Sequence, residues 1–272
     1  MLNPLFYFSK FPILKRVLPS IVKKLSKAFN LKVKVKRNNV YFLLNLKNQH
    51  DRALLFSPDY EPEQINFLVN EIYHQSDFST FIDIGACIGF YTLSIASKCP
   101  GISNIYSFEP NKNNYLCLEK NLELNVGIFN KTNLYNYGLS NVNSSKKLFT
   151  LKENDGAGGS ILEYEGQYDQ SKNAVSFDID VKIGDESLDI KDKKIILKID
   201  VERHEADVLR GLRNILIKNK CLIQIEIFEN YLDEVESILK DYGYTKFHEI
   251  PHGYTINLSD FYYKNYWYNV SV

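Results

Sequence analysis

The sequence predicts an α/β protein with a mainly parallel sheet and helices on both of its faces. From residue 61 onward, short apolar segments alternate with amphipathic segments of roughly 10–15 residues, which is the pattern of repeated βαβ units. Several apolar segments are followed directly by acidic residues and glycines, as at strand ends of ligand-binding α/β folds. The 272 residues are 44% hydrophobic and 24% charged, which excludes a disordered or fibrous chain and allows a core without disulfides.

The charge distribution divides the chain near residue 50. Residues 1–50 contain eleven Lys and Arg and no Asp or Glu, whereas the remainder carries 22 basic and 33 acidic residues. The balanced total gives no reason to expect a nucleic-acid partner. A basic arm on an acidic body predicts docking to an anionic surface, to an acidic lipid face or to the body itself.

Residues 1–60 are expected to form a basic N-terminal extension. Residues 13–29 have helical spacing and contain Pro19, which predicts a helix that is broken or restarts there. Residues 32–46 predict two short strands around an Asn-Asn turn. The apolar stripe of the helix either packs on the domain or contacts a membrane peripherally; its members are Ile13, Val17, Ile21, Leu25 and Phe29.

Residues 61–272 are expected to form one catalytic domain, with a loop and an extra strand inserted at 146–190. The insertion contains a glycine-rich segment and an alternating strand at 175–181, which we expect over the carboxyl edge of the sheet. The tail beyond residue 244 predicts a closing hairpin. Strands are expected at 81–84, 105–108, 134–139, 195–199 and 222–228, and helices at 61–73, 88–98, 111–124, 203–218 and 231–242.

The four cysteines and the first residues say little about where in the cell the protein is located. The cysteines form no CxxC pair and have no His at zinc-ligand spacing, so we expect free thiols, no metal and a reducing compartment. Residues 1–11 lack the features of a signal peptide, and no stretch of 18 apolar residues exists. These features predict a cytoplasmic protein, with peripheral membrane contact left open.

The first chemical motif covers residues 81–91, where a strand leads through a glycine turn into a helix. The turn places Asp83 before Gly85 and Gly89, so that a ligand could lie against bare backbone and meet free N–H groups of the helix. Dinucleotide sites require a glycine where Cys87 stands. The carboxylate favours a cationic ligand, and S-adenosylmethionine carries an ammonium and a sulfonium. An ordinary strand–helix turn is the alternative.

The second motif is the acid at the end of the next strand. Glu109 lies twenty residues after Gly89, where a carboxylate can accept hydrogen bonds from ribose hydroxyls, and Pro110 and Asn111 begin the following helix. A third strand end offers Asn136 toward an adenine edge, although a simple turn would explain it as well.

The fourth motif follows the apolar strand at 195–199. Asp200, Glu202 and His204 would all reach the carboxyl edge of the sheet, where open α/β folds bind their ligands. Because the ordinary pKa of histidine is near neutral, His204 is the expected general base, oriented by Asp200 or Glu202. Asp200 could instead hold the donor's ammonium. The alternative is an acid-decorated helix start, with His204 merely at the surface.

Glu226 is the one carboxylate inside the apolar strand 222–228. An unpaired charge there would cost several kcal/mol. Two interpretations remain open: Glu226 touches the acceptor, or it is the buried partner of a Lys or Arg.

Together these motifs resemble the FkbM family of S-adenosylmethionine-dependent methyltransferases over roughly residues 50–245. The carriers are Phe81-Ile-Asp-Ile-Gly-Ala-Cys-Ile-Gly-Phe-Tyr-Thr92, Phe108-Glu-Pro-Asn111, Asn121-Leu-Glu-Leu-Asn125, Gly158-Gly-Ser160, Leu197-Lys-Ile-Asp-Val-Glu202, Glu205, Val208-Leu209, Gly211 and Tyr60-Glu61. The resemblance implies a Rossmann-like, class I methyltransferase sheet of seven strands, mostly parallel with the last antiparallel. It also implies methylation of oxygen on sugars, polyketides or other small metabolites.

Carried over by position, the resemblance places Glu109 at the ribose, Asn136 near the adenine, and Asp200 and Glu202 at the reacting centre. The methionine end of the donor would be lined by Asp83, Gly85, Ala86 and Gly89. We also expect Tyr91, Pro110 and Asn111 to contact the donor.

Two positions depart from the family. The family usually has Asn where Cys87 stands and Gly where Arg203 stands. Arg203 either recognises an anionic acceptor or fills the acceptor space. The alternatives to a small-molecule or glycan O-methyltransferase are therefore a silent S-adenosylmethionine-binding protein and, on the same general fold, an NAD-dependent oxidoreductase. The oligomeric state is left open.

Overall fold

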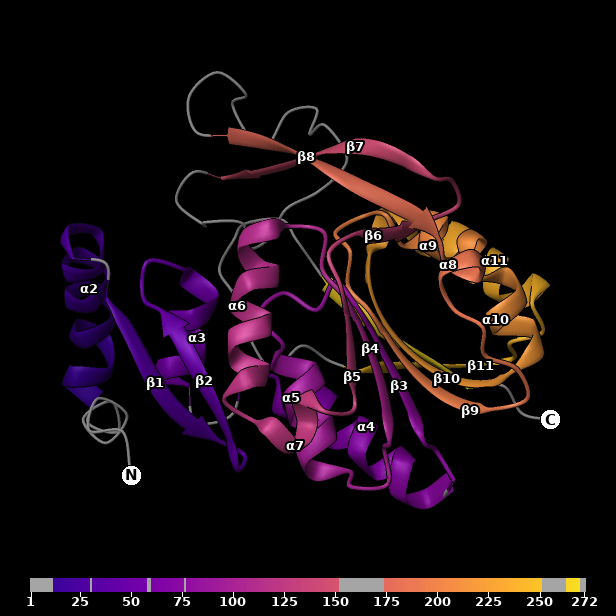
Figure 1. Cartoon of the computed structure of the whole chain (residues 1–272), viewed down its shortest axis with the longest axis horizontal. Coiled ribbons are helices and arrows are strands. Elements are labelled where there is room, and N and C mark those ends of the chain that lie inside the picture. The colour runs from indigo at the N-terminus through magenta and orange to yellow at the C-terminus, as the bar shows by residue number, and fades with distance from the viewer. Residues whose placement is uncertain are drawn as a thin grey trace.

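The computed structural model describes residues 12–29, 31–57, 60–75, 77–151, 174–250 and 263–269. A central sheet separates two layers of helices, with the N-terminal extension set against one layer and a small separate sheet above (Figure 1). No helix among these residues is long and apolar enough to cross a membrane.

The central sheet has the strand order β11-β12-β10-β9-β3-β4-β5. Its contiguous parallel part, from β10 to β5, has five strands; the expected seven are reached only with the antiparallel pairings of β12 to β10 and to β11. The mainly parallel α/β class is therefore confirmed. The strands are β3 (Thr80–Ile84), β4 (Asn104–Phe108), β5 (Thr132–Tyr135), β9 (Lys194–Ile199), β10 (Lys220–Phe228), β11 (Lys246–Ile250) and β12 (Tyr263–Asn269).

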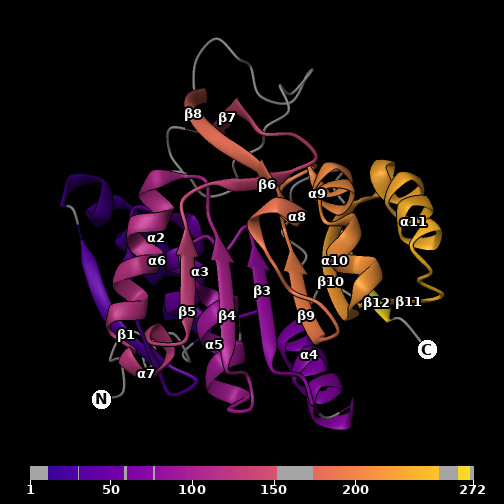
Figure 2. The same cartoon turned by 45° about the vertical axis from the view of Figure 1, so that its right-hand side comes forward.

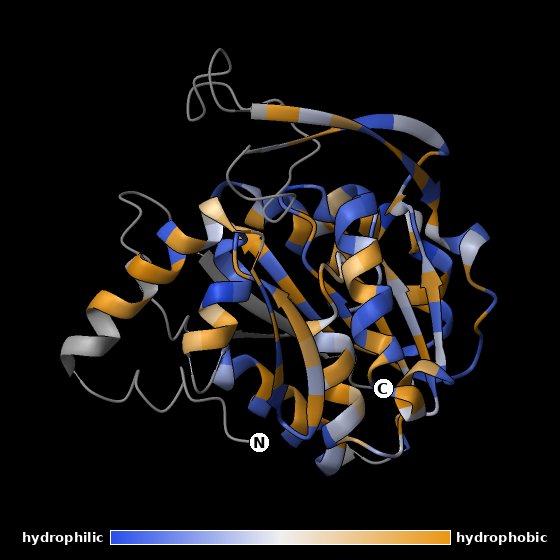
Figure 3. Ribbon diagram, turned by 60° about the vertical axis from the view of Figure 1, so that its left-hand side comes forward, coloured by the Kyte–Doolittle hydropathy of each residue, from blue (hydrophilic) through white to orange (hydrophobic). Residues whose placement is uncertain are grey.

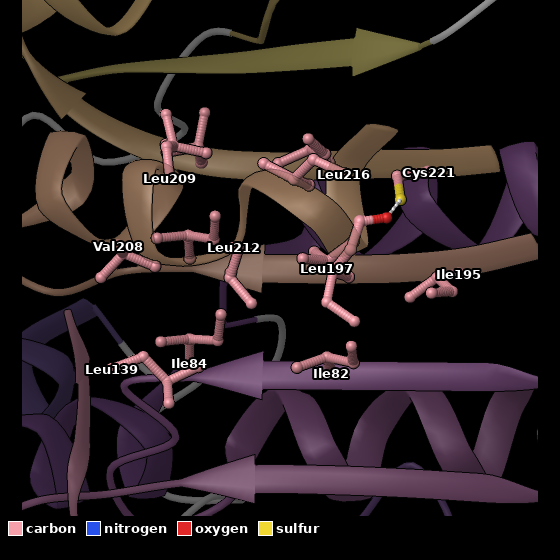
Figure 4. Close-up of a cluster of buried hydrophobic side chains, with 14 of the residues drawn as sticks. Ile82, Ile84, Leu139, Ile195, Leu197, Val208, Leu209, Leu212, Leu216 and Cys221 are labelled. Atoms are coloured by element: carbon pink, nitrogen blue, oxygen red, sulfur yellow. Dashed lines mark hydrogen bonds between the residues drawn. The ribbon is translucent and has the colours of Figure 1, made fainter. Parts of the chain in front are cut away.

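Alternation along the central strands directs apolar side chains to both helical layers. On one face, Ile82, Leu197 and Leu212 belong to a cluster that joins β3 and β9 to the helices (Figure 4). On the other face, Phe81 and Ile196 pack with α4 and α5. The helices are α4 (Pro62–Gln75), α5 (Phe90–Lys98), α6 (Lys112–Glu123) and α7 (Val126–Phe129) on one side, and α9 (Glu205–Gly211), α10 (Arg213–Lys218) and α11 (Leu232–Asp241) on the other.

The helix expected at 203–218 is two helices, which meet at Leu212. The short helix α7 and the 3-10 turn at Glu229–Tyr231 were not predicted. Both are too short to show a hydrophobic period.

The N-terminal extension contains α2 (Pro12–Ala28), the hairpin of β1 (Lys32–Arg37) and β2 (Val40–Asn45), and α3 (Gln49–Phe56). The hairpin prediction is confirmed, and its two turn residues, Asn38 and Asn39, both have positive φ as a type I′ turn requires. Contrary to the predicted break, α2 is continuous through Pro19. The helix α3 was not predicted.

The predicted strand 134–139 is also two elements. It ends as β5 at Tyr135 and resumes as β6 (Gly138–Ser140), which leaves the central sheet and pairs with β8 (Ala174–Ile183). With β7 (Ser144–Leu151) these strands form a second sheet of order β6-β8-β7. Figure 2 shows it above the carboxyl ends of β3, β4, β5 and β9, with α8 (Gly184–Ser187) following β8. The extra strand is thus confirmed, whereas the glycine-rich loop lies outside the described residues.

Candidate functional site

The turn after β3 brings two strand ends into direct contact. Gly85 has a φ of 83°, and a Cβ built on it would lie 1.9 Å from the backbone oxygen of Asp200, which follows β9. The N–H of Asp200 donates to the carbonyl of Ile84 at 3.0 Å. Only glycine permits this approach, so the first and fourth motifs meet where the sequence predicted.

The side chain of Asp83 points from the same strand into the protein. It is 1% exposed, and its Oδ2 accepts hydrogen bonds from the backbone N–H of Thr92 at 3.0 Å and from the Thr92 hydroxyl at 2.5 Å. Burial raises the pKa of Asp83 to about 6 even though these hydrogen bonds oppose the shift. The carboxylate thus fixes α5 to the strand, and contact with a ligand stays a prediction.

Glu109 joins the turn after β3 to the turn after β4. Its Oε2 accepts from the N–H of Cys87 and its Oε1 from the N–H of Asn111, both at 2.8 Å. The residue is 5% exposed, and burial raises its pKa to about 7 against those hydrogen bonds. The acid expected to hold a ribose is therefore fixed in orientation by two strand-end turns.

Two asparagines lie beside Glu109 at the turn after β4. Asn111 begins α6, where its Oδ1 accepts from the N–H of Asn113 at 2.9 Å, while its buried Nδ2 has no hydrogen-bond partner in the described chain. Asn136 donates through its Nδ2 to the carbonyls of Glu109 (2.9 Å) and Pro110 (3.2 Å). The predicted adenine residue therefore also holds the turn that presents Glu109.

A row of polar residues crosses the centre of the sheet. Register places Asp83 beside Ser107 of β4 and beside Lys198 of β9, and Lys198 beside Gln224 of β10. All four are buried within otherwise apolar strands. Because burying polar groups is costly without partners, this row marks a specialised region of the core.

Lys198 is the centre of that region. Its Nζ lies 3.2 Å from Asp200 Oδ2, 3.9 Å from Glu226 Oε2 and 4.8 Å from the ring centroid of Tyr91. Burial alone would lower the pKa of Lys198, but the surrounding carboxylates outweigh burial and raise it. Of the two interpretations of Glu226, the structure favours the buried ion pair.

Tyr91 connects this cluster to the segment before α4. Its hydroxyl donates to Glu61 Oε2 at 2.6 Å and accepts from Gln224 Nε2 at 3.1 Å. Burial raises the pKa of Glu61, while Lys198 and the Tyr91 hydrogen bond oppose that shift. The segment that contains Tyr60 and Glu61 therefore contacts, through Tyr91, the polar residues of the central strands.

His50 of α3 lies beside the same segment. Its Nδ1 is 3.3 Å from the Tyr60 hydroxyl, and its Nε2 makes no hydrogen bond to the described part of the chain. Solvent reaches the residue. Desolvation by surrounding protein lowers the pKa of His50, while the Asp200 carboxylate opposes the shift, so the imidazole is neutral at pH 7.

The two departures from the family lie at left-handed backbone positions. Cys87 has a φ of 50° and Arg203 a φ of 80°. Gly and Asn, which the family prefers there, are the residues that adopt this conformation at least cost. Two contacts hold Arg203 in place. Its backbone N–H donates to Glu205 Oε1 at 3.0 Å, and its guanidinium lies 4.5 Å from the centroid of the Phe228 ring.

His204 faces away from the Lys198 cluster. Its Nε2 is 3.0 Å from Ser140 Oγ of β6, its Nδ1 is 3.4 Å from Asp207 Oδ2, and it is 4% exposed. Burial lowers its pKa to about 4, although Asp207 opposes the shift. The prediction that Asp200 orients the His204 ring is wrong, because the Asp200 carboxylate pairs with Lys198 instead. Both ring nitrogens are engaged by the protein itself.

The half-buried Glu202 and the buried Glu205 add acidic groups next to this segment. Burial first, and then Asp200 and Glu205, raise the pKa of Glu202 to about 8; burial raises that of Glu205 to about 7. Glu202 and the carboxylates of Asp200, Glu226 and Glu61 interact with one lysine, Lys198, so acidic groups outnumber it and the region favours cationic ligands.

Sequence reasoning missed Lys198, Gln224, Glu61 and His50 as site residues. A signal existed for the first two, since a Lys or Gln inside an apolar strand requires a buried partner. None existed for His50, because only packing of the extension brings α3 to the sheet edge. The four cysteines are free thiols, as expected.

Comparison with known proteins gives the following matches. A family model described as "Methyltransferase FkbM domain" matches residues 83–246, more than half of the chain. Methyltransferase FkbM from Methylobacillus flagellatus KT is 15% identical with a TM-score of 0.48, covering 97% of this chain but only 60% of that one. TYW2 of M. jannaschii, solved in complex with AdoMet, is 12% identical with a TM-score of 0.48 and coverages of 87% and 84%. No curated protein matches the chain.

Proposed function

This chain belongs to the FkbM methyltransferase family, and we propose that it transfers a methyl group from S-adenosylmethionine to a hydroxyl oxygen of a sugar or another small metabolite. The observation that carries the proposal is the pair of turns after β3 and β4, which Glu109 bridges and which Gly85 brings against Asp200. The carboxyl ends of the parallel strands, where these turns lie, are where open α/β sheets bind their ligands.

The residues present fit this donor. Glu109 keeps acceptor capacity for ribose hydroxyls, since its two carboxylate oxygens offer about four lone pairs and accept from two backbone N–H groups and the side chain of Asn114. The buried Nδ2 of Asn111 supplies a donor that has no partner in the described chain. The excess of carboxylates around Lys198 suits the donor's ammonium and sulfonium. When bound, S-adenosylmethionine would supply an activated methyl group.

The chain must also accept the proton that the acceptor hydroxyl loses. His204 is the base expected from sequence, but its contacts with Ser140 and Asp207 favour a role in joining β6 to α9. We propose that His50 takes this role: its imidazole is neutral, its Nε2 is uncommitted within the described chain, and Tyr60 orients the ring through Nδ1.

The two histidines give a direct comparison. We expect His50→Ala to lower turnover roughly 10²-fold or more with donor affinity retained, and His204→Ala to lower thermal stability more than turnover. The measurements are kcat, the donor Kd by calorimetry, and Tm. A large loss of kcat in His204→Ala, with none in His50→Ala, would show that His204 is the general base.

Arg203 remains the proposed selector of the acceptor. Its guanidinium lies over Phe228 at the end of β10, so an anionic acceptor such as a phosphate or uronate could meet it. Arg203→Gly should then raise KM for anionic acceptors and leave neutral ones unchanged.

The function is tested on the purified full chain by identifying retained ligand with mass spectrometry, titrating S-adenosylmethionine and NADH, and assaying methyl transfer to mixed glycans. Donor binding with methyl transfer supports the proposal. Donor binding without transfer to any acceptor would favour the silent binding protein, and NADH oxidation would favour the oxidoreductase.

A further inference from the structure

The apolar stripe of α2 does not pack on the domain. Val17, Ile21 and Leu25 are each 46% exposed, and Phe29, just after the helix, is 62% exposed. The helix is held instead by a different strip, in which Val22 is 6% exposed and belongs to the core beneath the hairpin. The interpretation of this stripe as a packing face is therefore wrong.

The exposed stripe is continuous and sits at the margin of the molecule. Residues spaced four apart fall on one face of a helix, so Val17, Ile21 and Leu25 form successive steps along it. Figures 1 and 3 show α2 at the outer edge, beyond the hairpin, with hydrophobic positions on successive turns. No described element covers this face.

Basic residues flank the stripe. Lys23 and Lys24 are exposed on α2, and the neighbouring strand β1 exposes Lys32, Lys34 and Lys36. The first 50 residues carry eleven basic and no acidic groups, whereas the rest of the chain has an excess of acids. This distribution would turn α2 toward an anionic surface and the acidic body away from it.

We propose that α2 is an interfacial helix that binds the protein to anionic phospholipid membranes. An exposed apolar stripe bordered by lysines is the form of a helix that lies in the headgroup region, with its apolar side chains in the acyl boundary. A second copy of this chain is disfavoured, because the first 50 residues of each copy carry eleven basic and no acidic groups, so the two segments repel each other. A nucleic acid would use the lysines but leave the apolar stripe in water.

Vesicle sedimentation tests this proposal. The full-length protein is mixed with phosphatidylcholine vesicles, with and without phosphatidylglycerol, at low and high salt. We expect binding only to the anionic vesicles, weakened by salt. The double variant Ile21→Ser/Leu25→Ser should bind at least about tenfold more weakly.

The matched control replaces two apolar residues of similar exposure outside the extension. Val142 and Ile217 are 43% and 45% exposed, so Val142→Ser/Ile217→Ser should bind vesicles as the unchanged protein does. Circular dichroism establishes that each variant is folded. If the stripe variant fails to fold, Lys23→Glu/Lys24→Glu replaces it, with the same expected loss.

Three results would overturn the proposal. They are absence of binding to anionic vesicles, equal binding by the folded stripe variant and the unchanged protein, and a stripe-dependent dimer in light scattering that removes vesicle binding.

Discussion

Replacing Gly85 by Ala should destabilise the protein more than replacing a glycine that has only an unfavourable φ or only a steric clash. Gly85 combines both: its φ of 83° lies in the left-handed region, and its Cβ would lie 1.9 Å from the carbonyl oxygen of Asp200. The chain offers a control for each. Gly243 has a φ of 91° and open space, whereas Gly211 has no positive φ and a Cβ position 1.9 Å from Ser140 O.

The magnitudes follow from these geometries. An L-residue in the left-handed region costs roughly 1–2 kcal/mol, which is all that Gly243→Ala should lose. Carbon–oxygen contacts normally exceed about 3.3 Å, so Gly85→Ala must also separate the ends of β3 and β9. That movement strains the hydrogen bond from Asp200 N–H to Ile84 O, worth about 1 kcal/mol. We expect a total loss of roughly 3–4 kcal/mol.

Urea unfolding and donor calorimetry measure both consequences. Gly211→Ala should lie between the other two, since its clash is partly offset by about 1 kcal/mol of gained helix propensity. Only Gly85→Ala should also weaken binding of S-adenosylmethionine, because only Gly85 shapes the turn beside Glu109. Equal unfolding free energies for Gly85→Ala and Gly243→Ala would refute the claim that close approach to Asp200 requires glycine.

Three further changes test the electrostatics and the backbone. Lys198→Met should destabilise the protein by less than the roughly 3–5 kcal/mol that breaking a fully buried ion pair costs, because the carboxylates it leaves unpaired, Asp200 and Glu226, are 35% and 22% exposed. Adding Glu226→Gln should recover part of this loss in urea unfolding, and an unchanged loss would contradict the pairing. The pKa of Glu202 is raised from 4.5 to about 8 by burial first, so the folded state favours its protonated form and loses stability as pH rises between those values. Glu202→Gln should therefore raise Tm relative to the unchanged protein above pH 8 and not below pH 4.5, and a pH-independent difference would contradict this. Cys87→Asn should gain roughly 0.5–1 kcal/mol, since Asn tolerates the left-handed φ of 50° better; a lower Tm would argue against strain at this turn.

Much of the site was predictable because it depends on local sequence. A strand ending at Asp83, a glycine turn and a helix after Gly89 follow from neighbouring residues alone, as does the acid at the end of the next strand. Parallel strands bring their carboxyl ends to one edge, so the meeting of Asp83, Glu109 and Asp200 could be inferred without coordinates.

The partners of the ionisable residues could not be predicted in this way. His204 looks like a base in sequence because it follows two acids, yet its ring is held by Ser140, which is 64 residues away along the chain. The stripe of α2 looks like a packing face, yet the rotation of the helix on the hairpin exposes it. Each outcome depends on contacts between segments remote in sequence.

The sequence by itself therefore determined the α/β class, the strand-end motifs and the basic character of the extension, because hydrophobic period, turn chemistry and charge are properties of short segments. Only the tertiary structure decided that Lys198 neutralises Asp200 and Glu226, that α3 brings His50 to the sheet edge, and that β6 leaves the central sheet. The physical reason is that burial and pairing of charge depend on which distant segments pack together, and no local pattern encodes that choice.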